Sequence, residues 1–479
     1  MNVESIDNIY WLRMDLRVHD NPAFYHAVSN GSTLAVFCLP LKQWQQHHMS
    51  PHQQALIKQQ LLDVERSLRA LGIPLLVLSV DDFDHTHSEL LALAQKYNAK
   101  NIYFNYEYAL NERVLTDNVT KAFQSLQLGV YAYHDQCLIP PGEICNKQGQ
   151  PYKVFTAFKK AYVSELSSQM RPLYGLPAAQ SPLAFESNVT PLQQITHELL
   201  PPWQAGEQHA LDSMADFCAQ QLVDYKKDRD VPSIDGTSKL SASLAVGILS
   251  VRQCWQMANN IKLQSAQHEG IDTWISELVW RDFYRHLLHF YPSLCKHKAF
   301  KSSTEKLPWK KDQDLFDAWC QGKTGYPLVD AAMRQLNQTG WMHNRLRMVT
   351  AMFLTKHLFI DWRWGEQYFM ENLIDGDFAS NNGGWQWSAS TGVDAVPYFR
   401  IFNPIRQSER FDSNGTFIRQ YVPELSSLDN KQIHMPSPAV ARHLNYCEPI
   451  VEHKQAVSQT KQRFKQLDSS TILSQESLI

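Results

Sequence analysis

Short β-rich runs alternate with helical stretches over residues 8–139, and this alternation restricts the possible folds more than any other feature. The runs are rich in β-branched and aromatic residues and read NIYWL, TLAVFCL, IPLLVLSV, NIYFNY and VYAYH. The stretches 52–72 and 109–129 have helical periodicity, and each ends in a glycine, as helices commonly do. Strands that alternate with helices predict an α/β domain with a doubly wound parallel sheet. No GxGxxG follows the first run, so a dinucleotide in the usual pose is not expected there.

The rest of the chain has a different composition. Residues 171–206 are rich in proline and poor in apolar periodicity, which predicts a long linker. From about residue 208 the pattern is mostly helical, and 10 of the 13 tryptophans lie at or beyond Trp255. We therefore expect three parts: an α/β domain over residues 1–140, a linker over 141–207 and a large all-α domain over 208–479.

Charge and cysteine usage narrow the class of protein. The chain has 45 basic and 48 acidic residues and a net charge of −3, so it is not a generally basic nucleic-acid binder, although a local basic patch stays open. Its 8 cysteines form no CxxC pair, which favours reduced thiols and a cytoplasmic location. The N-terminal residues lack an apolar signal core, and no run of about 18 apolar residues predicts a membrane span.

The stretch TWISELVWRDFYRH predicts a helix with a carboxylate among aromatic rings. Trp274, Glu277 and Arg281 share one face at helical spacing, and Trp280 and Tyr284 lie beside it. A desolvated carboxyl group must be paired or protonated, so Glu277 is a candidate functional residue. The alternative is a core helix in which one glutamate has found a structural partner.

A basic and aromatic helix is predicted around TGWMHNRLRMVTAMFLTK. Trp341, Asn344 and Met348 share a face, and Arg345 and Arg347 flank it. Arginine can pair with phosphates and tryptophan can stack on bases, so this helix is a candidate nucleic-acid contact. The alternative is a helix whose cations simply face water.

The segment GTSKLSASLAVG places three hydroxyl side chains where a helix is expected to begin. Free backbone N–H groups together with the hydroxyls of Thr237, Ser238 and Ser241 would form an anion site. Ordinary capping of the helix by these hydroxyls explains the same pattern.

The segment DGDFASNNGG is polar and glycine-rich and lies between predicted helices. Asp375 and Asp377 suit a metal or a hydrogen-bonding ligand, but no third carboxylate follows at calcium-loop spacing. No HExxH, GxSxG or GxxxxGK[ST] motif occurs, so we expect no metal and no hydrolase or kinase site. The helical half therefore favours a bound aromatic cofactor and a nucleic-acid partner.

Five segments between residues 8 and 452 resemble the photolyase/cryptochrome family, and most closely the bacterial class I cyclobutane pyrimidine dimer photolyases of folate type. They read WLRMDLRVHDNPA, GTSKLSASLAVG, WRDFYRHLLHFYPSLCK, GKTGYPLVDAAMRQLNQTGWMHNRLRM and DGDFASNNGGWQWSASTGVDAVPYFRIFNP. The resemblance implies an α/β antenna domain, a linker and a helical FAD domain, in agreement with the three parts above. It also implies a monomer whose partner is double-stranded DNA that contains pyrimidine dimers.

The resemblance implies a set of FAD-binding residues. The positions that match those near the phosphates are Tyr225, Thr237, Ser238, Leu240 and Ser241, and those that match positions around the flavin and adenine are Arg281, Arg347, Asp375 and Asp377. Asn381 matches the residue beside flavin N5, where a neutral amide can bond the reduced flavin without adding negative charge. Plant cryptochromes carry aspartate there, so Asn381 favours a repair enzyme.

The resemblance also implies a pocket for a dimer flipped out of the duplex. Glu277 matches the carboxyl group that bonds the dimer and stabilises its radical anion, and Trp280 and Trp387 match the pocket walls. Asn344 and Met348 match the floor; the related (6-4) photolyases have adjacent histidines in this helix, so the cyclobutane dimer is the expected lesion. The candidate contacts to the DNA backbone are Arg229, Arg345 and Gln407.

Two further sets follow from the resemblance. The tryptophans that match an electron-hopping chain from flavin to surface are Trp385, Trp362 and Trp309. The positions that match contacts to a methenyltetrahydrofolate antenna are His47, Asn111, Glu112, Cys295 and Lys296.

The motif GGWQW is expected to serve two sides of the cofactor. Its glycines would let the backbone pass close to the isoalloxazine ring, where a side chain would intrude. Two residues that are two apart cannot share a helix face, so we expect Trp385 to point toward the flavin and Trp387 to line the dimer pocket.

Three other functions fit parts of this pattern. A blue-light photoreceptor, or cryptochrome, has the same fold, but such sensors often carry long C-terminal extensions, and only about 25 polar residues follow EPIVEHK here. Relatives specific for single strands lose parts of the aromatic wall that Trp280 keeps. A dark flavin oxidoreductase would need a nicotinamide site, and no glycine-rich fingerprint for one is present.

Overall fold

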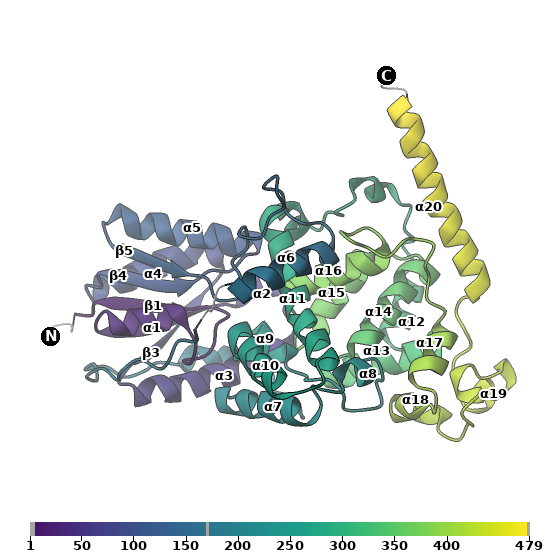
Figure 1. Cartoon of the computed structure of the whole chain (residues 1–479), viewed down its shortest axis with the longest axis horizontal. Coiled ribbons are helices and arrows are strands. Elements are labelled where there is room, and N and C mark those ends of the chain that lie inside the picture. Colours follow the sequence, from purple (N-terminus) through teal and green to yellow (C-terminus); the bar gives the residue numbers. More distant parts are fainter. Residues whose placement is uncertain (1–4, 169–171, 477–479) are drawn as a thin grey trace. The chain divides into compact units, whose positions relative to one another are not determined.

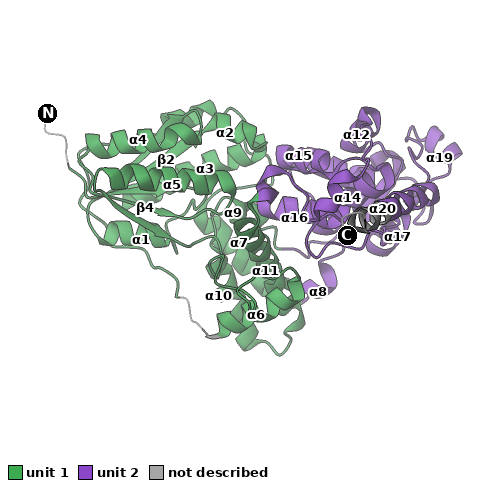
Figure 2. Cartoon of the chain, turned by 90° about the horizontal axis from the view of Figure 1, so that it is seen from above, with its two compact units in different colours: residues 1–223, 238–292, 374–377 green, residues 224–237, 293–373, 378–479 purple. Residues whose placement is uncertain are grey.

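The structure is a computed structural model that describes residues 5–168 and 172–476 (Figure 1). It divides into two compact units (Figure 2). Unit 1 comprises Met1–Val223, Ser238–Pro292 and Ile374–Asp377, and unit 2 comprises Asp224–Thr237, Ser293–Leu373 and Phe378–Ile479. The predicted boundaries at residues 140 and 207 divide the sequence into consecutive segments, whereas each compact unit is built from three separate segments. The boundaries therefore stay a prediction.

Unit 1 is built on a five-stranded parallel sheet with the strand order β3-β2-β1-β4-β5. The strands are β1 (Asn8–Leu12), β2 (Thr33–Pro40), β3 (Leu75–Val80), β4 (Asn101–Asn105) and β5 (Gly129–Tyr133). All five predicted strands are present, and the doubly wound α/β prediction is confirmed. The strand order changes direction between β1 and β4. In such sheets a crevice lies at this point, beside the carboxyl ends of the two strands.

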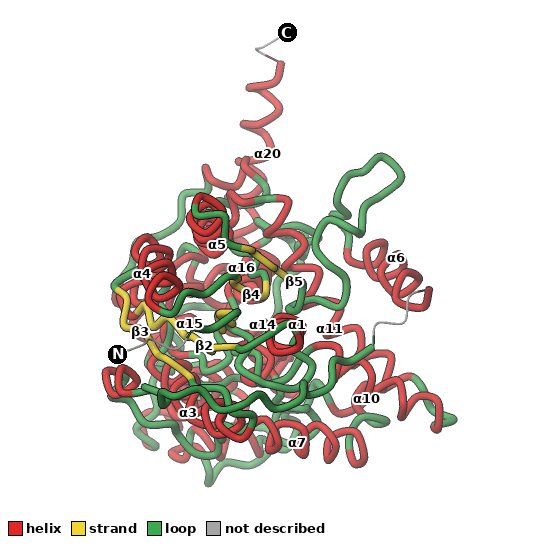
Figure 3. The backbone as a smooth tube through the Cα atoms, turned by 90° about the vertical axis from the view of Figure 1, so that its left-hand side faces the viewer, coloured by secondary structure: helices red, strands yellow, loops and turns green. Residues whose placement is uncertain are grey.

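Helices cover both faces of this sheet (Figure 3). They include α1 (Pro22–Ser29), α2 (Leu41–Gln46), α3 (Pro51–Ala70), α4 (Phe83–Lys96) and α5 (Leu110–Ser125). Side chains alternate along β1 as a strand requires: Ile9 and Trp11 join the cluster that contains residues of α4 and α5, whereas the Tyr10 ring lies 5.3 Å from Phe24 of α1. The sheet is therefore buried on both sides, which explains its apolar strands.

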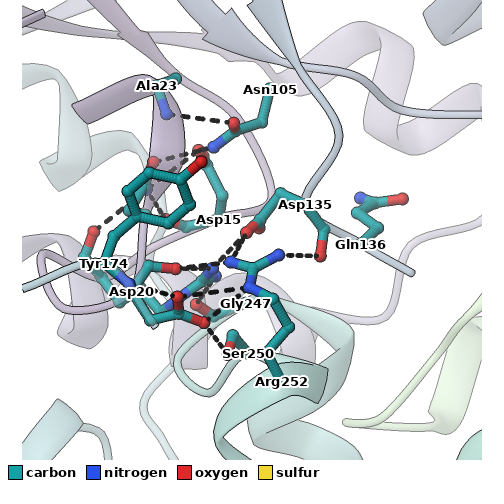
Figure 4. A network of polar contacts seen from close by, with 12 residues as sticks. Asp15, Asp20, Ala23, Asn105, Asp135, Gln136, Tyr174, Gly247, Ser250 and Arg252 are labelled. Atoms are coloured by element: carbon teal, nitrogen blue, oxygen red, sulfur yellow. Dashed lines mark hydrogen bonds and ion pairs between the residues drawn. The ribbon is translucent and has the colours of Figure 1, made fainter. Parts of the chain in front are cut away.

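A buried polar network follows the carboxyl ends of β1 and β4 (Figure 4). The Asn105 amide donates to Asp15, and Arg252 of α10 (Val251–Gln264) pairs with Asp20 at 3.0 Å and with Asp135 at 2.7 Å. Burial raises the pKa of Asp135, but Arg17 and Arg252 more than offset this and hold it below its usual value. The network joins residues 13–21 to the start of α10, so helical residues far along the chain belong to the unit that contains the sheet.

Unit 1 also contains helices that follow the sheet in sequence. These are α6 (Phe155–Ser168), η1 (Thr190–Gln194), α7 (Glu207–Gln220), α9 (Ser241–Ala245), α10 and α11 (Glu269–Phe290). Between residues 172 and 206 the short η1 is the only helix, in agreement with the proline-rich composition. This segment lies along β3, where the Val77 N–H donates to the carbonyl of Asn188 at 2.8 Å. The segment thereby covers the edge of the sheet.

Among the residues that the structure describes, the regular elements of unit 2 are all helices. Its elements are α8 (Tyr225–Asp228), η2 (Pro292–Lys296), η3 (Ser302–Lys306), α12 (Gln313–Cys320), α13 (Pro327–Thr339), α14 (Asn344–Met352), the π-helical η4 (Phe353–Leu358), α15 (Trp362–Asn372), α16 (Phe378–Ala389), α17 (Pro404–Phe411), α18 (Thr416–Tyr421), η5 (Pro423–Leu425), η6 (Gln432–His434), α19 (Pro438–His443) and α20 (His453–Glu476). Its core contains Trp319, Trp362 and Trp385. The prediction of an all-α second half is confirmed.

Candidate functional site

The segment expected to be a polar, glycine-rich connection is a helix from Phe378 onward. Helix α16 contains both asparagines, both glycines and both tryptophans of the segment. Trp385 is only 2% exposed, with its ring 5.0 Å from Phe369 and 6.0 Å from Trp319. Burial of this indole offsets the low helix propensity of paired glycines, which is why composition alone misleads here.

One face of α16 is open. A Cβ added to Gly384 would meet no atom within 4 Å, and Asn381 lies three residues earlier on the same face. The indole N–H of Trp385 is buried without a hydrogen-bond partner among the described residues. An open helix face, an amide and an unpartnered donor fit a flat, hydrogen-bonding cofactor such as the flavin that the resemblance implies.

The Asn381 side chain is held from the neighbouring helix. Its amide nitrogen donates to the main-chain carbonyl of Glu366 on α15 at 2.9 Å. Asn382 is buried and donates to the carboxylate of the same glutamate at 2.7 Å. Helices α15 and α16 therefore set the orientation of the residue predicted to face flavin N5.

Helix α14 displays the predicted pocket floor and its cations. Asn344 is exposed, Met348 is half-buried, and the Arg347 Nε donates to the carbonyl of Met342 at 2.8 Å. The Arg345 guanidinium pairs with Asp230 at 2.8 Å and lies over the Phe411 ring at 4.5 Å. The alternative in which the cations of this helix only face water is therefore wrong for Arg345.

The cap of α14 is a neutral histidine. The Nδ1 of His343 accepts a hydrogen bond from the Arg345 N–H at 3.2 Å. Burial lowers the pKa of His343 to about 4, against the opposing charge of Asp230, and the nearby arginines lower it further. The unprotonated ring is the form that can accept this bond, so the start of the helix stays capped at neutral pH.

Other predicted residues of unit 2 lie outside α14 and α16. Tyr225 begins α8 and is buried beneath Arg229, whose guanidinium lies 5.3 Å from the tyrosine ring centre. Thr237 is half-buried in the segment that follows. Gln407 lies on α17, and its buried side-chain oxygen has no hydrogen-bond partner among the described residues.

The three tryptophans of the predicted hopping chain lie on adjoining segments of unit 2. A Cβ on Gly365, one turn after Trp362, would lie 2.1 Å from the Trp385 ring, so the backbone of α15 touches that indole. Lys310, next to Trp309, forms an isolated parallel β-bridge with Ile360, which lies just before α15. Trp385 and Trp362 are buried whereas Trp309 is half-buried, so Trp309 is the member of the three that is nearest to solvent.

Helix α11 of unit 1 carries the predicted carboxyl group and pocket wall. Glu277 is half-buried, so it is less desolvated than its aromatic neighbours in the sequence suggest. The Trp280 ring stacks on Phe155 of α6 with centroids 3.5 Å apart. The Arg281 guanidinium donates to the carbonyl of Gln136 and to the neighbouring Asp282, the latter at 3.1 Å.

The two aspartates of the DxD pattern both lie in unit 1. Asp377 accepts two hydrogen bonds from Arg285 of α11, at 2.9 Å and 3.3 Å, while Asp375 is buried. Among the described residues no group of three His, Cys, Asp or Glu side chains is placed to hold a metal ion. Asp377 is therefore paired with the guanidinium of Arg285.

The hydroxyl-rich segment before α9 differs from a simple cap. Helix α9 begins at Ser241 and has Leu240 at its N-cap, where no side chain makes a capping bond. The Ser238 hydroxyl instead accepts from the indole N–H of Trp274 at 3.4 Å. The N-cap residue of α9 therefore provides no side-chain cap, and the role of the three hydroxyls stays a prediction.

Three of the predicted antenna residues meet in unit 1. His47 Nε2 lies 2.8 Å from the Asn111 amide, and its Nδ1 lies 3.6 Å from the Glu112 carboxylate. Burial raises the pKa of Glu112 and lowers that of His47. The other two, Cys295 and Lys296, lie on η2 and belong to unit 2.

Comparison with known proteins adds direct evidence on the family. A family model described as "DNA photolyase" matches residues 8–180, and one described as "FAD binding domain of DNA photolyase" matches residues 274–466. A deoxyribodipyrimidine photo-lyase of Vibrio cholerae is 44% identical over 95% of this chain and 99% of its own length. Another, of Escherichia coli, is 43% identical over 95% of this chain and 97% of its own length. The chain belongs to the DNA photolyase family.

Solved structures of the photolyase family have the same architecture. A bacterial class III photolyase from Agrobacterium tumefaciens superposes with a TM-score of 0.87 at 33% identity and covers 98% of this chain and 99% of its own. A cryptochrome from Synechocystis superposes with a TM-score of 0.85 at 29% identity, over 96% and 100% of the two chains. The fold is thus shared by photolyases and cryptochromes, and the site must distinguish them.

Several supporting residues of this photolyase were not predicted from its sequence. Phe155 stacks behind Trp280, Arg285 pairs with Asp377, and Glu366 holds both asparagines of α16. Arg285 lies one helical turn after Arg281, so helical spacing would have indicated it. Phe155 gave no such signal, because its contact joins segments far apart in the sequence.

Among the described residues, none of the helices has the length and apolar composition needed to cross a membrane.

Proposed function

We propose that this photolyase repairs cyclobutane pyrimidine dimers in DNA by light-driven electron transfer from FAD. The observation that carries the proposal is the 43–44% identity to deoxyribodipyrimidine photo-lyases over 95% of the chain. The match to a photolyase FAD-binding domain supports the cofactor. The chemistry supplied by bound, fully reduced FAD is the transfer of one electron to the dimer and its return after two C–C bonds have broken.

We assign the residues that hold FAD from the family resemblance. Tyr225, Thr237, Ser238, Leu240 and Ser241 bind the phosphates, and Arg281, Arg347, Asp375 and Asp377 surround the flavin and adenine. Asn381 accepts a hydrogen bond at flavin N5. The space beside Gly384 supports this placement, because a Cβ there would meet no side chain or other segment within 4 Å.

The chain's own side chains position the DNA lesion. Glu277 bonds the dimer, Trp280 and Trp387 form the walls of the pocket, and Asn344 and Met348 form its floor. The stack of Trp280 on Phe155 supports a rigid wall, since a ring fixed by its neighbour loses little entropy on binding. The contacts to the DNA backbone are Arg229, Arg345 and Gln407.

Two auxiliary functions complete the proposal. Trp385, Trp362 and Trp309 pass electrons from the surface to oxidised flavin, and the half-buried position of Trp309, against the burial of the other two, supports its place at the outer end. A methenyltetrahydrofolate antenna binds at His47, Asn111, Glu112, Cys295 and Lys296. The family resemblance is the support for a monomeric, cytoplasmic enzyme with domains over residues 1–140 and 208–479 and a linker over 141–207.

A light-dependent repair assay tests the function. Purified holoenzyme with reduced FAD is mixed with duplex oligonucleotides that contain a cyclobutane thymine dimer, a (6-4) photoproduct or no damage, in blue light and in darkness. We expect loss of the cyclobutane dimer in light alone. Loss of only the (6-4) product, or flavin photochemistry without repair, would contradict the assignment and favour a (6-4) photolyase or a blue-light photoreceptor.

A further inference from the structure

The orientation of the Asn381 amide is fixed by its partner. Its nitrogen donates to the main-chain carbonyl of Glu366 at 2.9 Å. A carbonyl can only accept, so the reverse orientation would oppose two oxygens. The side-chain oxygen of Asn381 is therefore the atom left to accept a hydrogen bond from a ligand.

The Glu366 carboxylate is almost completely buried at 2% exposure and has a different partner at each oxygen. One oxygen accepts from the Asn382 amide at 2.7 Å, and the other lies 3.1 Å from Nδ1 of His297. Burial of a carboxylate is costly unless it is paired and hydrogen-bonded. The Glu366 carboxylate is thus held between His297 and Asn382.

A second asparagine links this pair to the rest of α16. The Asn382 oxygen accepts from the Gln386 amide at 2.9 Å, one turn along the helix. The Gln386 oxygen in turn accepts from the Phe300 N–H at 2.9 Å. The segment 297–300, α15 and α16 are therefore joined by one chain of hydrogen bonds.

His297 is the member of this chain that solvent can reach. Its side chain is 55% exposed, whereas that of Glu366 is 2% exposed. The other charges near it are Lys296 and Lys298 on either side in the sequence and Arg363, whose Nε donates to the His297 carbonyl at 2.7 Å. Arg363 is itself paired with Glu305 at 2.8 Å and with Asp361 at 3.1 Å, so much of its charge is compensated.

We propose that the His297–Glu366 ion pair positions Asn381, so that the protonation state of an exposed histidine controls the amide that faces the flavin. When His297 is charged, Glu366 is fixed between α15 and α16 and its main-chain carbonyl holds the Asn381 nitrogen. The Asn381 oxygen then remains available to flavin N5–H. This inference rests on the proposed placement of the flavin beside Asn381.

The direction of the pH effect follows from the pair. The hydrogen bond to Glu366 raises the pKa of His297, while burial and Arg363 act in the opposite sense. A group whose pKa is raised on folding contributes stability that is complete below its unfolded pKa of about 6.5 and is lost as pH rises through the folded value. The His297–Glu366 ion pair is therefore formed in mildly acidic solution, and it is lost as pH rises above the pKa of His297 in the folded protein.

The first test measures the pair itself in the holoenzyme. The ring pKa of His297 is followed by NMR in the wild type and in Glu366→Gln, which keeps the size of the side chain but removes its charge and replaces one of its two acceptor oxygens by an NH2 donor. We expect the pKa to lie above about 6.5 in the wild type and to fall to about that value in the variant. An identical pKa in both proteins overturns the proposal, whatever the repair activity is.

The second test measures the fraction of flavin held as the one-electron-reduced form against pH. We expect this fraction to fall in the wild type as pH rises through the His297 pKa. His297→Gln should lose the pH dependence and match the high-pH wild type, and His297→Arg should lose it and match the low-pH wild type. A merely structural histidine would not produce this reciprocal pattern.

The matched control is His85→Gln. His85 is also exposed and lies 2.6 Å from a carboxylate, Asp82, but it belongs to unit 1 and to the start of α4. This variant should keep the wild-type pH profile. If His297→Gln also keeps the wild-type pH profile, the proposed role of the His297–Glu366 pair is rejected. If the pH profiles differ as expected but dimers are not repaired in light, only the proposed function fails.

Discussion

Trp385 and Trp387 lie two residues apart on α16 and have different surroundings. Trp385 is 2% exposed and packs on Phe369, whereas Trp387 is half-buried. The i, i+2 spacing predicted that the two rings face different sides, because such residues project from different sides of a helix. The assignment of Trp385 to the flavin and of Trp387 to the dimer stays a prediction.

Replacement of Glu277 tests the carboxyl group assigned to the dimer. Glu277→Ala should lower the repair yield per absorbed photon by roughly tenfold, since a hydrogen bond to a charged group contributes about 1.5–3 kcal/mol. Affinity for damaged duplex should change less. Parallel measurements of photorepair and equilibrium binding check this, and an unchanged yield would remove Glu277 from its role.

Replacement of Trp309 tests the outer end of the hopping chain. Trp309→Phe should abolish photoreduction of oxidised flavin, because phenylalanine is much harder to oxidise than indole, and should spare repair by enzyme that was reduced beforehand. Trp364→Phe is the control, since Trp364 is also half-buried and packs on Phe316 at 5.2 Å. Equal loss of photoreduction in both variants would contradict the assigned route.

Helices α15 and α16 make the candidate site through close packing at one glycine and open space at another. Gly365 of α15 lies against the Trp385 ring, whereas nothing lies within 4 Å of a Cβ on Gly384. The sequence predicted that the glycines of GGWQW let the backbone approach the flavin, and this stays a prediction. It did not predict that α16 is helical from Phe378, because paired glycines disfavour a helix and the compensating burial of Trp385 is a tertiary effect.

The two glycines give opposite expectations when changed to alanine. Gly365→Ala should lower the free energy of unfolding by about 1–3 kcal/mol, because the Trp385 ring must move. Gly384→Ala should raise the stability of the apoprotein by about 0.5–1 kcal/mol through helix propensity, yet weaken FAD retention if the flavin uses the open face. Thermal unfolding without FAD and FAD titration separate the effects, and full FAD retention in Gly384→Ala would contradict the placement.

At the scale of the whole molecule, strand and helix periodicity predicted the parallel sheet and the all-α second half, while the predicted domain boundaries stay a prediction. Residues 238–292 belong to the compact unit that contains the sheet, in part because Arg252 pairs with Asp20 and Asp135. Such buried ion pairs join residues distant in sequence, and local pattern carries no information about them.

The net charge of −3 implies that attraction to DNA is local rather than general. Affinity for damaged duplex should fall with salt, and Arg229→Gln should reduce the log–log salt slope by about 0.9 if Arg229 neutralises one phosphate. The control is Arg66→Gln, an exposed arginine on α3 paired with Asp63 at 2.7 Å. Binding isotherms at several salt concentrations check this, and identical slopes in the two variants would remove Arg229 from the DNA contact.

The central claim is tested most directly by a single flash. Holoenzyme with fully reduced FAD is bound to duplex that contains one cyclobutane thymine dimer, and both thymine recovery and the flavin spectrum are recorded after the flash. We predict that dimers return to thymines while the flavin ends in its starting redox state. Flavin that ends oxidised with the dimer intact would contradict light-driven repair by this chain.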